Sequence, residues 1–107
     1  MSDTFERIKR LVASQAVRIS EHGYDELAAD DMFTRDILEG IAQGVVVEEY
    51  PAYPKGPCTL VLQRDRAGNP LHILWGIPKG HAEPAVLVTA YRPDPAIWQE
   101  GFTRRRT

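Results

Sequence analysis

His72 lies in the middle of the stretch GNPLHILWG, residues 68–76, and its side chain is the best suited to proton chemistry in this sequence. The stretch alternates, with Leu71, Ile73 and Trp75 on one side of an extended chain and His72 on the other. An imidazole titrates near neutral pH, so a histidine on the open face of a sheet can serve as a general acid or base. The pattern therefore predicts a strand with one buried face and a titratable group on its other face.

A second strand, residues 85–91, ends in Tyr91 and is followed by Arg92. A phenol and a guanidinium beside an imidazole can hold a phosphate or a carboxylate. The sequence does not fix the register of the two strands. The alternative is that His72 is a solvated or hydrogen-bonded residue with no chemical role, and the sequence leaves both readings open.

Alternation along the strands also predicts which residues share the face of His72. In residues 58–63 and 86–91 the wholly apolar positions, Cys58, Leu60, Leu62, Val86, Val88 and Ala90, are expected to lie against helices. The opposite, half-polar face would then carry Thr59, Gln63, His72, Thr89 and Tyr91. On such a face His72 is expected to be at least partly accessible, so that His72→Ala would change thermal stability little.

Periodicity predicts the elements that must position these residues. Helices are expected over 3–15, after Ser20 as N-cap, and over 34–43, where Thr34 is the N-cap and Gly44 the stop. Strands are expected over 45–51, 58–65, 70–77 and 85–91, with connections too short for crossover helices. The expectation is an α+β fold in which N-terminal helices pack on one face of a four-stranded antiparallel sheet.

The domain organisation follows from the same pattern. We expect a single domain over residues 1–107, made of a helical part (1–44), an antiparallel sheet (45–92) and a short helical turn with a basic tail (93–107). Val17 and Ile19 alternate with Arg18 and are consistent with a short extended piece between the first two helices.

The composition is that of a globular protein, with 43% hydrophobic and 26% charged residues in a chain of 107. No apolar run approaches the roughly 20 residues that span a bilayer, and no secretory signal is expected, so we expect a cytoplasmic protein without a membrane partner. The net charge of −2 gives no support to a dedicated nucleic-acid binder, and DNA is not expected as a partner. The strongest cation cluster is Arg104, Arg105 and Arg106 at the end of the sequence.

His22, His81 and Cys58 are the remaining candidates for ligands or nucleophiles. They form neither a close pair nor a pair four residues apart, as structural zinc sites usually do, so neither a metal nor another cofactor is expected. Cys58 is expected to be a small buried residue. His22 has the alternatives of a cap or packing role near a helix start and of a role in a site, and His81 is expected to be solvated in a turn.

Four stretches in their order resemble the small bacterial family known as domain of unknown function 4258: SEHG (20–23), ILEGIAQGVVVEEYP (37–51), PLHILWG (70–76) and VTAYRPDPAIW (88–98). Members of that family show a Ser-x-His start, a glycine that closes the helix before an apolar-acidic strand, and a strand that carries the PLH motif. A TxYxPD strand end, a tryptophan and terminal arginines complete the pattern.

The family is in turn similar to the RelE/ParE toxins, which pack two helices on a small antiparallel sheet, and many of which cut mRNA on the ribosome. This resemblance implies a metal-independent endoribonuclease of a toxin–antitoxin pair, with RNA or the ribosome and an antitoxin-like protein encoded nearby as partners. It implies His72, Tyr91 and Arg92 as catalytic residues. It implies substrate binding by His22, Gln63, Thr89, Arg104 and Arg105. If the protein is a working ribonuclease, His72 and Tyr91 are expected to lie within about one side-chain reach across adjacent strands.

One position departs from the family pattern. Family members commonly carry a basic residue at the fourth position after the Ser-x-His histidine, where this sequence has Glu26. A carboxylate there would repel a phosphate backbone. Two further hypotheses therefore stand beside the ribonuclease: a non-catalytic module that binds a protein through an edge strand or the open face, and a small-molecule-binding domain with its pocket between the sheet face and the loop 51–57.

Overall fold

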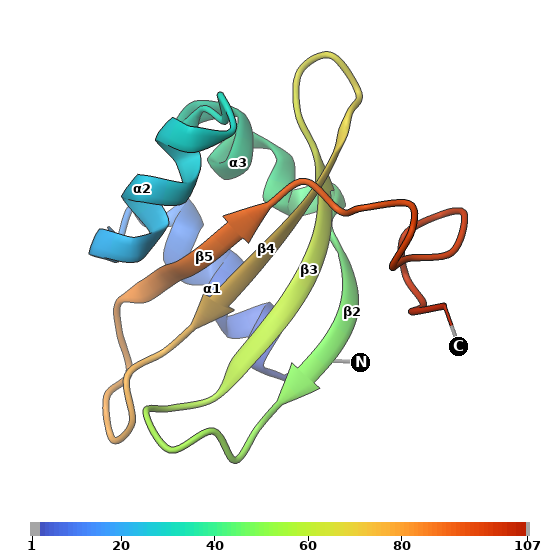
Figure 1. Cartoon of the computed structure of the whole chain (residues 1–107). Coiled ribbons are helices and arrows are strands. Elements are labelled where there is room, and N and C mark those ends of the chain that lie inside the picture. The colour runs from blue at the N-terminus through green and yellow to red at the C-terminus, as the bar shows by residue number, and fades with distance from the viewer. Residues whose placement is uncertain (1–2, 107) are drawn as a thin grey trace.

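The computed structural model describes residues 3–106, and within them the helices cover one face of a single sheet (Figure 1). In chain order the elements are α1 (Asp3–Ala13), β1 (Val17–Ile19), α2 (Glu21–Ala29), α3 (Thr34–Gly40), η1 (Ile41–Gln43), β2 (Val45–Tyr50), β3 (Cys58–Arg64), β4 (Pro70–Gly76) and β5 (Ala85–Tyr91). The α+β class is confirmed, and the helices precede the four longer strands, although β1 lies between α1 and α2. No helix in the described part of the chain is long and apolar enough to cross a membrane.

The sheet has five strands in the order β1-β5-β4-β3-β2, so the expectation of a four-stranded antiparallel sheet is wrong. The pairs β2–β3, β3–β4 and β4–β5 are antiparallel, as expected from their short connections. The fifth strand is β1, which adds to the edge of β5 in parallel and makes the sheet mixed. A three-residue segment is too short for two-residue periodicity to distinguish a strand from any other extended piece.

Helix α2 starts where the sequence predicts, because the Ser20 side chain accepts a hydrogen bond from the Gly23 backbone at 2.9 Å. The Ser20 hydroxyl donates in turn to the Val88 carbonyl at 2.8 Å, which attaches this helix start to β5. Gly23 permits the approach, since a Cβ there would lie 3.0 Å from Leu87 atoms. For α3 the N-cap is Phe33 and makes no side-chain hydrogen bond, so the prediction of Thr34 as cap is wrong by one residue.

The core lies between the helices and the inner face of the sheet. As predicted, Leu71, Ile73 and Trp75 are buried in it, together with Ile8 of α1 and Ile37 of α3. The prediction for β3 is inverted, because its pairing with β4 places Thr59 opposite Trp75 and Gln63 opposite Leu71. Cross-strand partners in an antiparallel pair share a face, so Cys58, Leu60 and Leu62 lie on the helix-free face instead.

The prediction for β5 is partly inverted by a bulge. Leu74 pairs with Thr89 whereas Trp75 pairs with Leu87, so Val88 has no direct partner. An extra residue shifts the alternation, and Leu87 and Ala90 both join the core. Thr89 and Tyr91 lie on the helix-free face as predicted, whereas the prediction that Val86 and Val88 face the helices is wrong.

Gln63 can occupy the core because both ends of its amide are paired. Its Oε1 accepts from the Trp75 indole at 3.0 Å, and its Nε2 donates to the Ile37 carbonyl at 2.8 Å. A buried amide with both functions satisfied costs little, whereas an unpaired one is expensive. The side chain therefore joins β3, β4 and α3 inside the core and takes no part in the face of His72.

Gln63→Ala should therefore lower the free energy of unfolding by at least about 2 kcal/mol, because it leaves the Trp75 N–H and the Ile37 carbonyl without a partner. Urea unfolding followed by circular dichroism measures this change. Gln99→Ala, at an exposed position, is the matched control and should change the stability little. Equal stabilities for the two variants would contradict the role assigned to Gln63.

Candidate functional site

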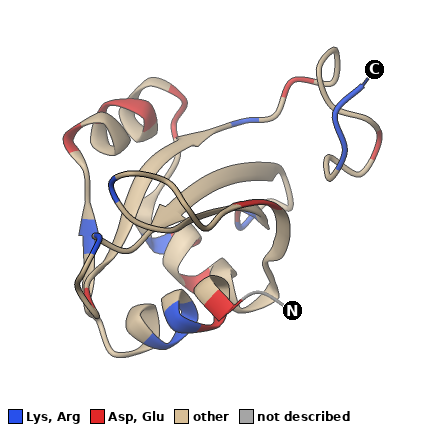
Figure 2. Ribbon diagram, turned by 90° about the horizontal axis from the view of Figure 1, so that it is seen from below, with Lys and Arg blue, Asp and Glu red and all other residues tan. Residues whose placement is uncertain are grey.

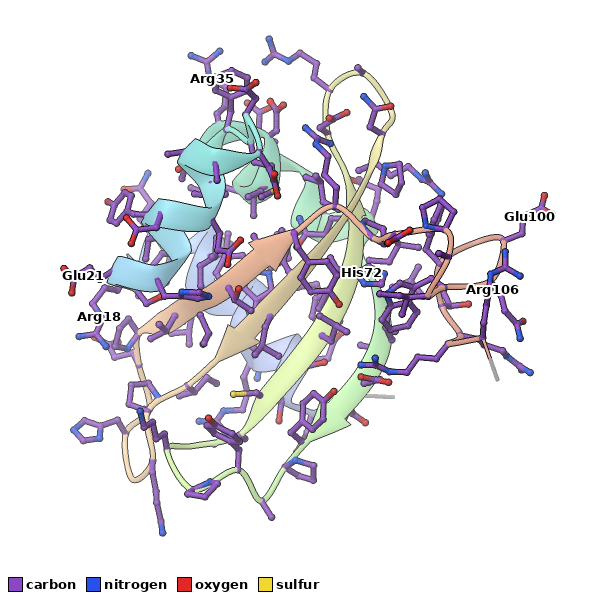
Figure 3. The ribbon with its side chains drawn as sticks, viewed as in Figure 1. Arg18, Glu21, Arg35, His72, Glu100 and Arg106 are labelled. Atoms are coloured by element: carbon purple, nitrogen blue, oxygen red, sulfur yellow. The ribbon has the colours of Figure 1, made fainter. Side chains whose placement is uncertain are left out.

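His72 lies on the helix-free face of β4, toward the C-terminal segment, which we define as residues 93–106 (Figure 3). Its Nδ1 is 3.0 Å from the Tyr91 hydroxyl and its Nε2 is 2.8 Å from the Phe102 carbonyl oxygen. The side of the sheet and the closeness of His72 to Tyr91 are as predicted. The predicted accessibility is wrong, because His72 is 0% exposed.

The burial of His72 results from the C-terminal segment, which leaves β5 and runs past β4 and β3 toward β2 (Figure 1). The Trp98 ring packs edge-on against the imidazole with 4.4 Å between centroids, and Trp98 itself is 3% exposed. Asp94 organises the turn before it, since its carbonyl accepts from the Trp98 backbone at 2.9 Å. The turn was expected, but residues 98–105 then fold back in a bridged loop that the sequence does not predict.

The hydrogen bonds define the protonation state of His72. A carbonyl oxygen only accepts, so Nε2 carries the proton and donates to Phe102, while Nδ1 accepts from the Tyr91 hydroxyl in the neutral ring. Burial lowers the pKa of His72, and the bond to Phe102 and the negative charge of Glu48 oppose that shift. Burial also raises the pKa of Tyr91. The pair is therefore neutral at pH 7, with no free ring nitrogen.

Glu48 of β2 connects the sheet to the C-terminal segment. Arg105 donates to its two carboxylate oxygens, at 2.9 Å from Nε and 3.1 Å from Nη2, and the Tyr50 hydroxyl donates to the same carboxylate. The Arg105 hydrogen bond lowers the pKa of Glu48, and burial together with Glu48 raises that of Tyr50. The guanidinium also lies 4.7 Å from the Trp98 ring centroid. Arg105 thus connects β2 to the ring that covers His72.

A groove crosses the helix-free face beside this cluster. It consists of two adjoining pockets, of about 330 and 250 Å³, which share Tyr53, Cys58 and Val88. Its floor is apolar and comes mainly from β3, β4 and β5. Three tyrosines (Tyr50, Tyr53, Tyr91) and three cations (Arg18, Lys55, Arg105) line it, and neither pocket has a carboxylate among its lining residues.

The charge of this groove contrasts with that of the helices, where many Asp and Glu residues gather (Figure 2). In and next to α2 these are Glu21, Asp25, Glu26, Asp30 and Asp31. The charges are thus unevenly distributed, with acidic residues gathered in and next to α2, charges of both signs on α1, and cations around the groove. A local cation cluster attracts anionic ligands whatever the total charge of the chain.

The structure brings together four of the residues proposed from the sequence: His72 and Tyr91 are hydrogen-bonded, and Thr89 and Arg105 line the neighbouring pocket. It does not bring Arg92 to them, because that guanidinium pairs with Asp65 at 3.2 Å and with the Asp30 carbonyl at 3.4 Å. His22 pairs with Glu26 on α2, in the helical layer. Gln63 faces the core, and Arg104 is exposed and contributes only its carbonyl to the loop.

Sequence reasoning missed six residues of this face: Arg18, Glu48, Tyr50, Tyr53, Lys55 and Trp98. Two of them, Tyr53 and Lys55, lie in the proline-rich loop 51–57. An aromatic and a basic residue in this loop were the only signal in the sequence that could have indicated them. The position of this loop at one wall of the groove agrees with the geometry expected for the small-molecule hypothesis.

Cys58 lies in the floor of the groove, and burial raises the pKa of its thiol. Within residues 3–106 no group of His, Cys, Asp or Glu has the arrangement of a metal site.

Comparison with known proteins identifies the family of the chain. The family model described as domain of unknown function (DUF4258) matches residues 19–92, which is more than half of the sequence. The chain belongs to the DUF4258 family. The match contains β2, β3, β4 and β5 of this DUF4258 protein, begins at Ile19, the last residue of β1, and ends before the C-terminal segment. No curated protein and no solved structure shows a significant match to it.

The sequence predicts that substitution of His72 changes thermal stability little. Because His72 is buried in the structure, we expect its substitution to destabilise this DUF4258 protein instead. His72→Ala should lower the free energy of unfolding by about 2–4 kcal/mol, because it creates a cavity and removes a buried hydrogen-bonded pair. Urea unfolding at pH 7.5 measures this change, with His81→Ala, at an exposed residue, as the control.

The stabilising contribution of His72 should also depend on pH. Because the folded state lowers its pKa, the unfolded chain binds the proton first on acidification, and stability is lost as the pH falls from about 6.5 through the folded-state pKa. The stability difference between wild type and His72→Gln should therefore be largest above pH 6.5 and shrink toward pH 5. A difference that grows on acidification would contradict the neutral, buried imidazole.

Proposed function

We propose that this DUF4258 protein binds single-stranded RNA in the groove on the helix-free face of its sheet. The observation that carries the proposal is the lining of the groove, which in a net acidic protein combines three tyrosines, three cations and no carboxylate. Sites for single-stranded nucleic acid combine aromatic side chains, on which bases stack, with cations that follow the backbone.

The dimensions of the face support the same class of ligand. Five strands at about 4.8 Å spacing make a face roughly 19 Å wide, which is wide enough for a short stretch of nucleotides. Arg18 lies on the strand at one edge, and Arg105 contacts Glu48 of the strand at the other edge. Tyr53 is 50% exposed and Tyr50 39% exposed, so their rings are available for stacking.

The first test measures the contribution of stacking. Tyr53→Ala should weaken binding of a fluorescein-labelled single-stranded RNA about tenfold in a fluorescence anisotropy titration, because one base loses its stacking partner. Tyr24→Ala is the matched control, since Tyr24 is a comparably exposed tyrosine on α2, on the opposite side of the sheet. Equal losses in the two variants would remove the groove from RNA binding.

Salt dependence provides an independent check of the same proposal. Three phosphate contacts predict a slope of about −2 for log K against log salt, and Lys55→Glu should make the slope shallower by about 0.7 or more. Arg10→Glu, the same charge change on the exposed part of α1, should leave the slope unchanged. If a mononucleotide binds as tightly as a longer strand, the small-molecule hypothesis with its pocket at the loop 51–57 is favoured instead.

The resemblance to RelE/ParE toxins adds a catalytic part to the proposal, which is metal-independent cleavage of the bound strand. In that reaction a base takes the proton of the 2'-hydroxyl, O2' bonds to phosphorus, the bond from phosphorus to O5' breaks, and an acid protonates O5'. Tyr91 supplies a phenol at one end of the groove, His72 supplies an imidazole behind it under the C-terminal segment, and Arg105 supplies a cation for the phosphate. Cleavage requires that the Phe102 carbonyl leave His72, since both ring nitrogens are otherwise engaged.

Expression of the wild type in a bacterial host should then arrest growth and fragment mRNA, and Tyr91→Phe should relieve both effects, because it removes only the hydroxyl. Growth curves and primer extension on total RNA measure the two effects, with Tyr24→Phe as control. An arrest that survives His72→Gln combined with Tyr91→Phe removes the pair from catalysis. Absence of arrest by the wild type leaves RNA binding as the function. An antitoxin-like partner would act, on this proposal, by covering the groove.

A further inference from the structure

Among the described residues, no backbone–backbone hydrogen bond joins the C-terminal segment to the sheet. Within the described residues, every backbone–backbone hydrogen bond of residues 94–106 is internal to the segment, as between the Gln99 N–H and the Arg104 carbonyl or the Arg106 N–H and the Ile97 carbonyl. The connections to the sheet are the bond between His72 and the Phe102 carbonyl, the pair of Arg105 with Glu48, and the packing of Trp98 on His72. A loop that forms its own backbone hydrogen bonds can leave the sheet without breaking any ladder.

The attached form also contains a strained residue at its most important contact. Phe102, whose carbonyl accepts from His72, has a φ of 59°, in the left-handed region that a bulky residue rarely adopts. Arg105 and Glu48 are both partly solvent-exposed, and such ion pairs contribute little net stability. The segment is therefore held over His72 mainly by the packing of the buried Trp98 ring, with the Phe102 carbonyl and one partly exposed ion pair as its polar contacts.

Arg105 has two competing roles. It binds Glu48 and packs on Trp98, which holds the segment closed, and it also lines the pocket beside Tyr91. A phosphate in that pocket would compete with the Glu48 carboxylate for the same guanidinium. Ligand binding at this end of the groove and closure of the segment therefore oppose each other.

From these contacts we infer that the C-terminal segment is an internal ligand of the helix-free face, which detaches as a unit and exposes His72 when an anionic ligand takes Arg105 from Glu48. The packing of the segment over His72 is a property of the protein alone. Its detachment by an anionic ligand rests on the proposed RNA binding. The carbonyl of Phe102 occupies the position at Nε2 that an oxygen of the external ligand would take. His72 is thus part of a covered site, and the segment regulates access to it.

The first experiment measures closure without any ligand, by acylation of histidines with diethyl pyrocarbonate and mass spectrometry of the full chain. In the wild type the exposed His22 and His81 should react readily while His72 is protected. Glu48→Gln removes the ionic partner of Arg105 and should raise the His72 rate about threefold to fivefold, the range set by one exposed ion pair. Its matched control, Glu49→Gln at the next, exposed position of β2, should leave the rate unchanged.

Trp98→Ala removes the cover of the imidazole directly and should raise the rate of His72 more than tenfold, whereas Ile97→Ala at the exposed neighbouring position should not. Melting followed by circular dichroism shows whether the sheet persists under the reaction conditions. Protection of His72 that survives both Glu48→Gln and Trp98→Ala would overturn the inference. It would equally be overturned if His72 reacted only in samples whose sheet had unfolded.

The second experiment measures the competition with the labelled single-stranded RNA. Because Glu48→Gln weakens closure but keeps Arg105, it should bind the RNA about threefold to fivefold more tightly than the wild type, and Glu49→Gln should not. If His72 opens as expected but no variant binds RNA, the proposed function fails while the closure stands. If the RNA binds equally to all variants, the groove binds RNA but the segment is not its competitor.

Discussion

The organisation of the helix-free face depends on one buried, neutral imidazole. His72 has both ring nitrogens hydrogen-bonded, one to a side chain of the neighbouring strand and one to a backbone carbonyl of a distant segment. A buried polar group must be paired, so this residue determines where the chain after β5 can lie. The position of Trp98 over the ring, and through it that of Arg105, follows from that requirement.

Each face of the sheet contains a buried polar side chain, and the two side chains are enclosed in different ways. On the helical side Gln63 is enclosed permanently, because the helices and strands around it form the core. On the other side His72 is enclosed by a loop that, among the described residues, shares no backbone–backbone hydrogen bond with the sheet. The first arrangement stabilises the fold, whereas the second can open without loss of the sheet, and this difference makes the helix-free face the functional candidate.

The charge distribution gives the same face its chemical character. Carboxylates gather in and next to α2, and the groove is lined by cations and tyrosines. Glu48 is a carboxylate near the groove, and it is paired with the Arg105 guanidinium and accepts a hydrogen bond from the Tyr50 hydroxyl. Membership of the DUF4258 family adds no activity to this description, since a shared fold does not specify function. The function therefore has to be argued from the groove and its side chains.

The sequence by itself determined the helices, the four longer strands and the side of β4 that carries His72, because long periodic segments reveal which residues can be buried. The closeness of His72 to Tyr91 was expected only as a requirement of the ribonuclease hypothesis, because the strand register that pairs them is set by the tertiary structure. Only the tertiary structure decided the face of β3, because the exchange of Gln63 for Leu62 in the core depends on hydrogen-bond partners from α3 and β4. Tertiary contacts also recruited β1 to the sheet and placed Trp98 over His72, because a three-residue strand and a loop carry no periodicity from which their packing can be read.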